Sequence, residues 1–241
     1  MTYNRHCVAA KPYDWPHPPS ELSRKTTALV IIDMQRDFCE QGGYLSQQGY
    51  DIHPVRAIIP RIRMLLDFCR DLGYQIYHTR EGHRPDLSDL PERELFRSRL
   101  NPAKLGIGDQ GPLGRLLVRG QPGHDIIPEL YPREGEPIID KPGKGAFANT
   151  DFDLLLKVKG IQNLILCGVT TDVCVHSTMR EANDRGYDCL LVEDACAASN
   201  KELHDFAVMS TKAEGGVFGA VSSANNITLM LGDDDEEEHE S

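Results

Sequence analysis

The stretch GVTTDVCVHSTMREA, residues Gly168–Ala182, follows directly on an apolar run, NLILC, at Asn163–Cys167. The run has the length and composition of a buried strand, and the residues after it predict a helix over Val173–Arg185 with Thr171 as its N-cap. Cys174 therefore stands where a buried strand becomes a helix. Unpaired N–H groups and the positive end of the helix dipole stabilise an anion there, so Cys174 is a candidate nucleophile.

Apolar runs of strand length alternate with helical patterns along most of the chain. Strands are predicted at Thr27–Asp33, Tyr74–Thr79, Glu136–Lys141, Asn163–Cys167 and Asp188–Asp194, with a short sixth strand within residues 215–223. Helices are predicted at Val55–Leu72, Asp151–Gly160, Val173–Arg185 and Lys201–Lys212. This alternation requires crossover connections and a mostly parallel sheet covered on both faces. We predict a single three-layer α/β/α domain of about six strands over residues 27–231.

The two ends of the chain depart from this pattern. Residues 1–26 are rich in proline and polar side chains, without the apolar core of a signal peptide, and predict an arm over the surface or over a neighbouring subunit. Residues 232–241 carry seven acidic side chains of a chain whose net charge is −11, and predict a solvated, disordered tail. Since the chain has no long apolar window and no basic patch, neither a membrane span nor nucleic-acid binding is expected.

The seven cysteines are odd in number and include no C-x-x-C pair, and several lie inside apolar runs. This usage is typical of reduced, buried cysteines in a cytoplasmic protein and argues against a disulfide framework. Six of the seven are expected to be structural, whereas Cys174 has an unusual setting. A redox role for Cys174 would need a resolving cysteine, and Cys39 is the candidate for that role.

A long segment, Glu81–Asp125, shows no periodic pattern and is predicted to be irregular. Loops of this length in a compact domain usually have a function of their own. We expect a lid or a subunit contact here.

Three reactive residues fall at the predicted carboxyl ends of strands, where the functional groups of parallel sheets gather. Two strands end in Asp33 and Lys141, and a third leads into Cys174. Because a thiol attacks as its thiolate, it needs a proton acceptor; Asp33 can take this proton and return it to a leaving amine. Lys141 stabilises the negative charges, and the backbone N–H groups of Thr170 and Cys174 are the expected oxyanion donors.

Each of these residues also has a structural explanation when taken alone. Asp33 suits a helix cap or a strand-end ion pair, Lys141 a solvated lysine, and Cys174 a structural cysteine. Their combination at neighbouring strand ends favours an enzyme. A non-catalytic binding protein that retains the pocket is the alternative class.

Three motifs resemble the signatures of the isochorismatase-like cysteine hydrolases: IIDMQRDF at Ile31–Phe38, DKPGKGAF at Asp140–Phe147 and GVTTDVCV at Gly168–Val175. The resemblance implies the isochorismatase-like fold, an Asp33–Lys141–Cys174 triad and a cis peptide bond between Val169 and Thr170. Lys144 is the alternative to Lys141, which the family spacing favours. The resemblance also implies a homo-oligomer, often a tetramer.

Metal binding and cofactors are not expected. Nicotinamidases of this superfamily carry an Asp-x-His metal motif after the second strand, whereas the matching stretch here, HTREGHRPD, offers only Glu81 and His83. Asp51 and His53 have the spacing of metal ligands, but they precede the first long helix. Cys174 also distinguishes the chain from true isochorismatases, which act on a vinyl ether without that thiol.

Longer stretches, including HTREGHRPDLSDLP and TTDVCVHSTMREANDRGY, resemble the biuret and triuret hydrolases, with ureidoacrylate amidohydrolases as more distant relatives. This resemblance implies that Phe38 and Tyr44 line the pocket and that residue 214 contacts the far end of the substrate. Biuret hydrolases have Gln at that position, and this chain has Glu214. A carboxylate only accepts hydrogen bonds, so Glu214 would favour an N–H-rich or cationic substrate end and disfavour ureidoacrylate. The alternative is a surface glutamate turned away from the pocket.

We therefore expect a cysteine amidohydrolase that releases ammonia from a small ureide of the biuret or triuret type through a covalent intermediate on Cys174. Ureidoacrylate or an N-carbamoyl amide is the alternative substrate class within the same superfamily.

Overall fold

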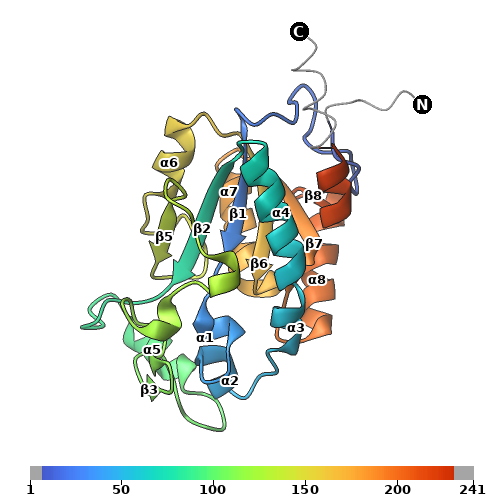
Figure 1. The fold of residues 1–241 in the computed structure, drawn as a ribbon. Helices are drawn as coiled ribbons and strands as arrows, with labels where there is room; N and C mark the ends of the chain where they lie inside the picture. The colour runs from blue at the N-terminus through green and yellow to red at the C-terminus, as the bar shows by residue number, and fades with distance from the viewer. Residues whose placement is uncertain (1–6, 231–241) are drawn as a thin grey trace.

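A single six-stranded sheet forms the centre of the protein in a computed structural model that describes residues 7–230 (Figure 1). The strand order is β5-β2-β1-β6-β7-β8, and all neighbouring strands are parallel. The strands are β1 Thr27–Ile32, β2 Gln75–Glu81, β5 Ile138–Lys141, β6 Asn163–Val169, β7 Asp188–Ala197 and β8 Ala220–Ser222. The predicted parallel sheet is confirmed.

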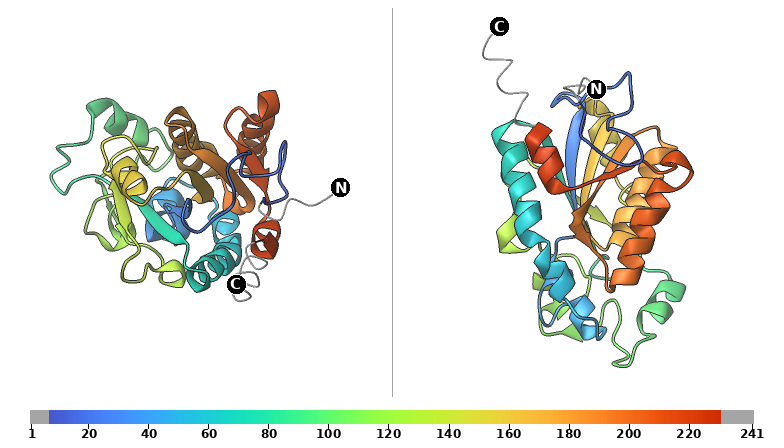
Figure 2. Two further views of the ribbon diagram at one scale, coloured as in Figure 1. Left: turned by 90° about the horizontal axis from the view of Figure 1, so that it is seen from above. Right: turned by 90° about the vertical axis from the view of Figure 1, so that its right-hand side faces the viewer.

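Helices cover both faces of the sheet (Figure 2). One face is covered by α4 (Ile59–Asp71), and the other by α7 (His176–Asp184) and α8 (Lys201–Lys212); α6 (Phe152–Val158) follows the edge strand β5. With both faces covered, β1 and β6 are buried along their whole length, which explains why their sequences are continuous apolar runs. The predicted three-layer α/β/α architecture is confirmed.

The predicted helix over Val55–Leu72 is two helices, α3 (His53–Ala57) and α4. Pro60 stands in the first turn of α4. Because proline has no N–H group, it cannot continue the hydrogen bonding of the preceding turn, but it fits the start of a new helix. Periodicity alone does not reveal such a break.

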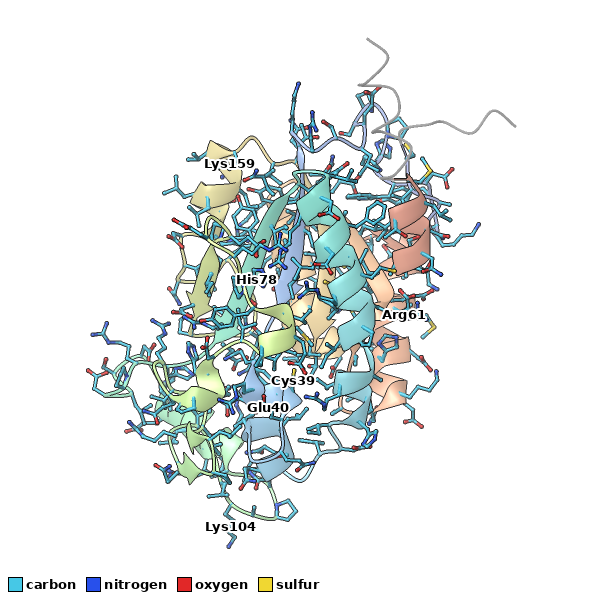
Figure 3. The ribbon with its side chains drawn as sticks, in the orientation of Figure 1. Cys39, Glu40, Arg61, His78, Lys104 and Lys159 are labelled. Carbon is cyan, nitrogen blue, oxygen red and sulfur yellow. The ribbon has the colours of Figure 1, made fainter. Side chains whose placement is uncertain are left out.

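The segment between β2 and β5 is more ordered than predicted. It contains α5 (Glu92–Ser98), a short hairpin of β3 (Gln110–Gly111) and β4 (Gly114–Arg115), and the turns η1 (Pro122–His124) and η2 (Pro128–Leu130). Its part with α5 and the hairpin lies, together with α1 (Arg36–Cys39) and α2 (Tyr44–Gln47), beyond the carboxyl ends of the strands (Figure 1), whereas η2 contacts α4. Figure 3 labels Lys104 at the outer end of this segment. The segment therefore borders the edge where reactive residues are predicted.

The described part of the N-terminal arm lies along β8, the outermost strand on one side of the sheet. Lys11 forms an antiparallel bridge with Val221 of β8, and Val8 pairs with Trp15, which is fully buried. This pairing covers the outermost strand. The predicted tail at 232–241 falls outside the described residues. Within residues 7–230, no helix has the length and hydropathy that a bilayer crossing requires.

Candidate active site

The pairing of β1 with β6 brings the ends of the two strands together. Ile32 and Gly168 are register partners, so Asp33 follows β1 beside the end of β6. Gly168 has φ +115°, and a Cβ atom there would stand 2.1 Å from the carbonyl oxygen of Ile32. Only glycine allows this approach, which sets the distance between Asp33 and the residues that follow β6.

Asp33 and Lys141 form a completely buried ion pair. The Lys141 ammonium lies 2.7 Å from Asp33 Oδ2 and donates to the carbonyl oxygen of Gly143 at 2.9 Å. The hydroxyl of Thr79 donates to Asp33 Oδ1 at 2.6 Å. These contacts from β2 and β5 fix the carboxylate in a fully buried position.

The thiol of Cys174 completes this cluster, but its hydrogen-bond acceptor is Glu81. The Cys174 sulfur donates to Glu81 Oε2 at 3.2 Å, and the Lys141 ammonium lies 3.7 Å from the same oxygen. Ligand atoms of Asp33, Glu81 and Cys174 all lie within 4.8 Å of one another. The three predicted residues therefore meet at one point, together with a second carboxylate.

Glu81 is held from its backbone and from its side chain. Gln35 accepts from the Glu81 N–H at 2.7 Å and donates to its carbonyl oxygen at 2.9 Å. The Lys144 ammonium lies 2.6 Å from Glu81 Oε1 and 3.2 Å from Glu94 of α5. Although burial raises the pKa of Glu81, Lys144 and Lys141 together lower it to about 2. Glu81 is therefore a fixed anion.

The pKa values of Asp33 and Cys174 shift in the opposite direction to that of Glu81. Burial is the main cause that raises the pKa of Asp33, and it outweighs the opposing effect of Lys141. Burial also raises the pKa of Cys174 well above that of a free thiol, and the two carboxylates add to this effect while Lys141 opposes it. The predicted stabilisation of a resting thiolate is therefore wrong: the thiol keeps its proton, and Asp33 is the stronger base of the two carboxylates.

The turn that carries Cys174 is a π-helical turn, η3 (Thr171–Val175), ahead of α7. Its N-cap is Thr170, without a side-chain cap, and the carbonyl oxygen of Thr170 accepts from the N–H groups of Val173 and Val175. The predicted cap, Thr171, instead places its hydroxyl 2.9 Å from His204 of α8. That buried hydroxyl pairs with the neighbouring helix and not with its own turn. The Val169–Thr170 peptide bond is cis.

Asp33, Glu81 and Cys174 could also be read as ligands for a metal ion. The ammonium group of Lys141 stands between the two carboxylates, at 2.7 Å and 3.7 Å. It supplies the positive charge that a cation would bring. The residues fit a charge-compensated thiol site better than a metal centre.

Comparison with known proteins identifies the family. Residues 27–225 match the isochorismatase domain. The chain belongs to the isochorismatase family. The ureidoacrylate amidohydrolase RutB of Pantoea ananatis is 31% identical over 208 residues, which cover 86% of this chain and 82% of that protein. The protein of the same name from Yersinia enterocolitica is 32% identical over 178 residues, or 73% of this chain and 77% of that protein.

Solved structures show the same fold. A cysteine hydrolase from Pseudomonas syringae pv. phaseolicola has a TM-score of 0.76 at 24% identity, with 94% of this chain and 97% of that chain covered. An isochorismatase family protein from Desulfovibrio vulgaris has a TM-score of 0.71 at 28% identity, with 86% and 98% covered.

Of the pocket residues implied by the family resemblance, two lie by the site. The rings of Phe38 and Tyr44 meet edge to face, with centroids 6.3 Å apart. Burial is the main cause that raises the pKa of the Tyr44 hydroxyl to about 12, and the neighbouring Glu81 carboxylate adds to it. Tyr44 therefore borders the charged cluster.

Glu214 lies elsewhere. It is exposed, in the turn between α8 and β8 with φ 52°. A Cβ atom at Gly216, two residues later, would stand 2.8 Å from the ring of Tyr13 in the N-terminal arm. Since α8 starts near Thr171 and runs back to the amino ends of the strands, this turn is at the edge of the sheet opposite Cys174. Within one chain, Glu214 is not brought to the thiol.

Sequence reasoning missed Glu81 as a partner of the thiol and considered it only as a metal ligand. The signal was available: Glu81 ends β2, and β2 lies between β1 and β5. The predicted strand stopped at Thr79, two residues before the observed end of β2. Arg80 pairs with Asp140 at 2.7 Å, and Glu81 pairs with lysines, so both belong to the strand.

The cysteines show no disulfide. All seven lie within residues 7–230, each is buried, and none is bonded to another. Cys39 ends α1 near the carboxyl edge of the sheet (Figure 3), and burial raises its pKa strongly. The thiol of Cys174 is directed to Glu81, an arrangement that suits nucleophilic chemistry better than exchange with Cys39.

Proposed function

We propose that this amidohydrolase of the isochorismatase family cleaves a C–N bond of a small ureide, with Cys174 as nucleophile. The observation that carries the proposal is the buried cluster in which Cys174 meets Asp33, Glu81 and Lys141. A thiol, a raised-pKa carboxylate and a fixed ammonium group are the components of nucleophilic acyl transfer.

The first step forms a bond between the Cys174 sulfur and the carbonyl carbon of the ureide. Because the thiol is protonated at rest, its proton moves to Asp33 as the sulfur attacks. At rest the S–H group points to Glu81, so it turns to Asp33, which has an oxygen within 4.8 Å of the sulfur. Lys141 balances the two carboxylates. The N–H groups of Thr170 and Cys174 are the proposed oxyanion donors beside the cis peptide bond.

The tetrahedral intermediate then breaks its C–N bond, and the departing nitrogen takes the proton from Asp33. This leaves a carbamoyl or related acyl group on sulfur. Water adds to this group after giving a proton to Asp33, the C–S bond breaks, and the thiolate recovers that proton. Atoms and charge balance without a cofactor.

Two kinds of ureide are candidate substrates, one with a carboxylate and one without. The names of the relatives favour ureidoacrylate, a ureide with a carboxylate. The motif resemblance favours biuret or triuret, which are uncharged. Glu214, which would repel a substrate carboxylate, lies within this chain at the end of the sheet opposite Cys174. We therefore propose a carboxylate-bearing ureide first and biuret or triuret second.

Ammonia release from a panel tests the proposal: ureidoacrylate, N-carbamoyl amino acids, biuret, triuret and nicotinamide. We expect ureidoacrylate to have the highest kcat/KM and Cys174→Ala to abolish the activity. A response to nicotinamide alone would leave the nucleophile in place and reject the ureide. Activity of Cys174→Ala close to wild type would reject the nucleophile itself.

We further propose that the chain assembles as a homo-oligomer. Leu203, Phe206 and Met209 form an exposed apolar row on α8, with 40%, 59% and 63% exposure. Apolar rows of this kind commonly mark subunit contacts. Light scattering is expected to give a multiple of the 26.9 kDa chain mass, and a monomer at micromolar concentration would contradict the assembly.

A further inference from the structure

Lys144 is the cation of the site that solvent can reach. Its side chain is 39% exposed, whereas that of Lys141 is completely buried. Its ammonium contacts one oxygen from Glu81 at 2.6 Å and one from Glu94 at 3.2 Å. A positive group at the border of the buried cluster is available to an incoming ligand.

The two carboxylate partners of Lys144 are held very differently. Glu81 is 2% exposed and is fixed by Gln35 on its backbone and by Lys141 beside its other oxygen. Glu94 is 21% exposed, lies on the short helix α5, and has a second cation, Arg97, at 2.5 Å. Since Glu94 keeps an ion pair when it leaves Lys144, it is the exchangeable partner.

The position of Lys144 relative to the thiol suits a short substrate. Glu81 joins them: one of its oxygens accepts from Cys174, and the other contacts Lys144. A carbonyl carbon at the sulfur and an anionic group at Lys144 would thus be separated by a few covalent bonds. The ring of Phe38 contacts that of Tyr44, whose hydroxyl is influenced by the charges of both Glu81 and Lys144.

We propose that Lys144 binds the carboxylate of the substrate and that Glu94 occupies this place in the unliganded site. The inference rests on the proposed cleavage of a ureide and names the group that selects it. One carboxylate replaces another at the same ammonium, so the charge of the site is conserved. An uncharged ureide cannot make this exchange. If it displaced Glu94, the Lys144 ammonium would lose one of its two anionic partners, and if Glu94 stayed, its carboxylate would occupy the position that the ureide needs.

The test compares ureidoacrylate with its primary amide, which has nearly the same shape but an uncharged amide in place of the carboxylate. Each protein is assayed by mass spectrometry for cleavage at the ureido carbonyl, because the terminal amide of the second substrate could itself release ammonia. The ratio of kcat/KM for the acid to that for the amide is the readout. If a substitution at Lys144 also disturbs Glu81, the rates for the acid and the amide both fall and their ratio stays unchanged. The ratio therefore isolates the contact to the carboxylate.

Lys144→Gln is expected to lower this ratio by about 10- to 100-fold, the range for one charge-assisted hydrogen bond. Lys144→Arg, which keeps the charge, should recover part of it. Lys157→Gln is the control, because Lys157 is an exposed lysine paired with Asp153 on α6. It should leave the ratio within about twofold of wild type.

Glu94→Gln provides an independent test should Lys144→Gln fail to fold. Without the competing carboxylate, KM for the acid should fall several-fold while KM for the amide stays near wild type. An unchanged ratio in Lys144→Gln, or equal KM changes for acid and amide in Glu94→Gln, would overturn the inference. Wild-type protein that cleaves the amide but not the acid would overturn this inference alone; protein that cleaves no ureide would overturn the proposed function as well.

Discussion

Replacing Glu81 by glutamine removes one negative charge from the buried cluster at nearly constant volume. The pKa of Glu81 is about 2 in the folded protein against an ordinary value of 4.5, and the side chain is 2% exposed, so solvent hardly screens its partners. The difference between the two values corresponds to about 3 kcal/mol of folding free energy at neutral pH. We expect Glu81→Gln to lower the free energy of unfolding by about this amount at pH 7.

The loss of unfolding free energy in Glu81→Gln depends on pH. Because the pKa of Glu81 is lower in the folded protein than in the unfolded chain, its stabilisation is present above about pH 4.5 and is lost as the pH falls toward 2. Urea denaturation followed by circular dichroism should therefore show a difference between wild type and Glu81→Gln that shrinks to about 1 kcal/mol at pH 3.

The control is Glu202→Gln, which removes an exposed carboxylate from the first turn of α8. It should change the free energy of unfolding by less than about 0.5 kcal/mol at both pH values. A difference between wild type and Glu81→Gln that is equal at pH 7 and pH 3 would refute the assignment of Glu81 as an anion fixed by Lys144 and Lys141. A loss below about 1 kcal/mol at pH 7 would refute it as well.

Three further predictions concern the residues around the thiol. Cys174→Ser should unfold at a midpoint temperature within a few degrees of wild type yet lose at least about 1000-fold in kcat, since the hydroxyl is a poorer nucleophile than the thiol; ammonia release and calorimetry check both. Wild-type kcat/KM should rise with pH through the raised pKa of Asp33, because only its ionised form accepts the thiol proton. A pH–rate profile of Asp33→Asn should lack this acidic limb, and an unchanged limb would assign the base elsewhere. Gly168→Ala should cost more than about 3 kcal/mol in urea denaturation, because its φ of +115° and the 2.1 Å approach to Ile32 exclude a Cβ atom.

Much of the sheet could be predicted because its strands are buried on both faces and read as continuous apolar runs. β1 and β6 are examples, and α8 begins and ends at the predicted residues. The meeting of Asp33, Lys141 and Cys174 follows from one topological rule, the shared carboxyl edge of parallel strands. That rule needs no information about side-chain contacts.

The remaining features depend on contacts between residues far apart in the chain. Glu81 was assigned to the irregular segment after the second strand, and its partner Lys144 lies after the next long segment of the chain. The hydroxyl of Thr171 turns to His204 of α8. The raised pKa of Cys174 comes from burial, which local patterns at a helix start do not show.

The most direct test of the account traps the acyl group on the enzyme. Wild-type protein mixed with excess ureidoacrylate, quenched in acid within one turnover and digested, should show on the peptide that contains Cys174 the mass of the acyl group that C–N cleavage leaves behind. This is one carbamoyl group if the substituted nitrogen departs, or the substrate less ammonia if ammonia departs. Asp33→Asn should accumulate the adduct more slowly. Turnover of the same substrate with an unmodified Cys174 peptide at every quench time, or with the adduct on another of the seven cysteines, would contradict the account.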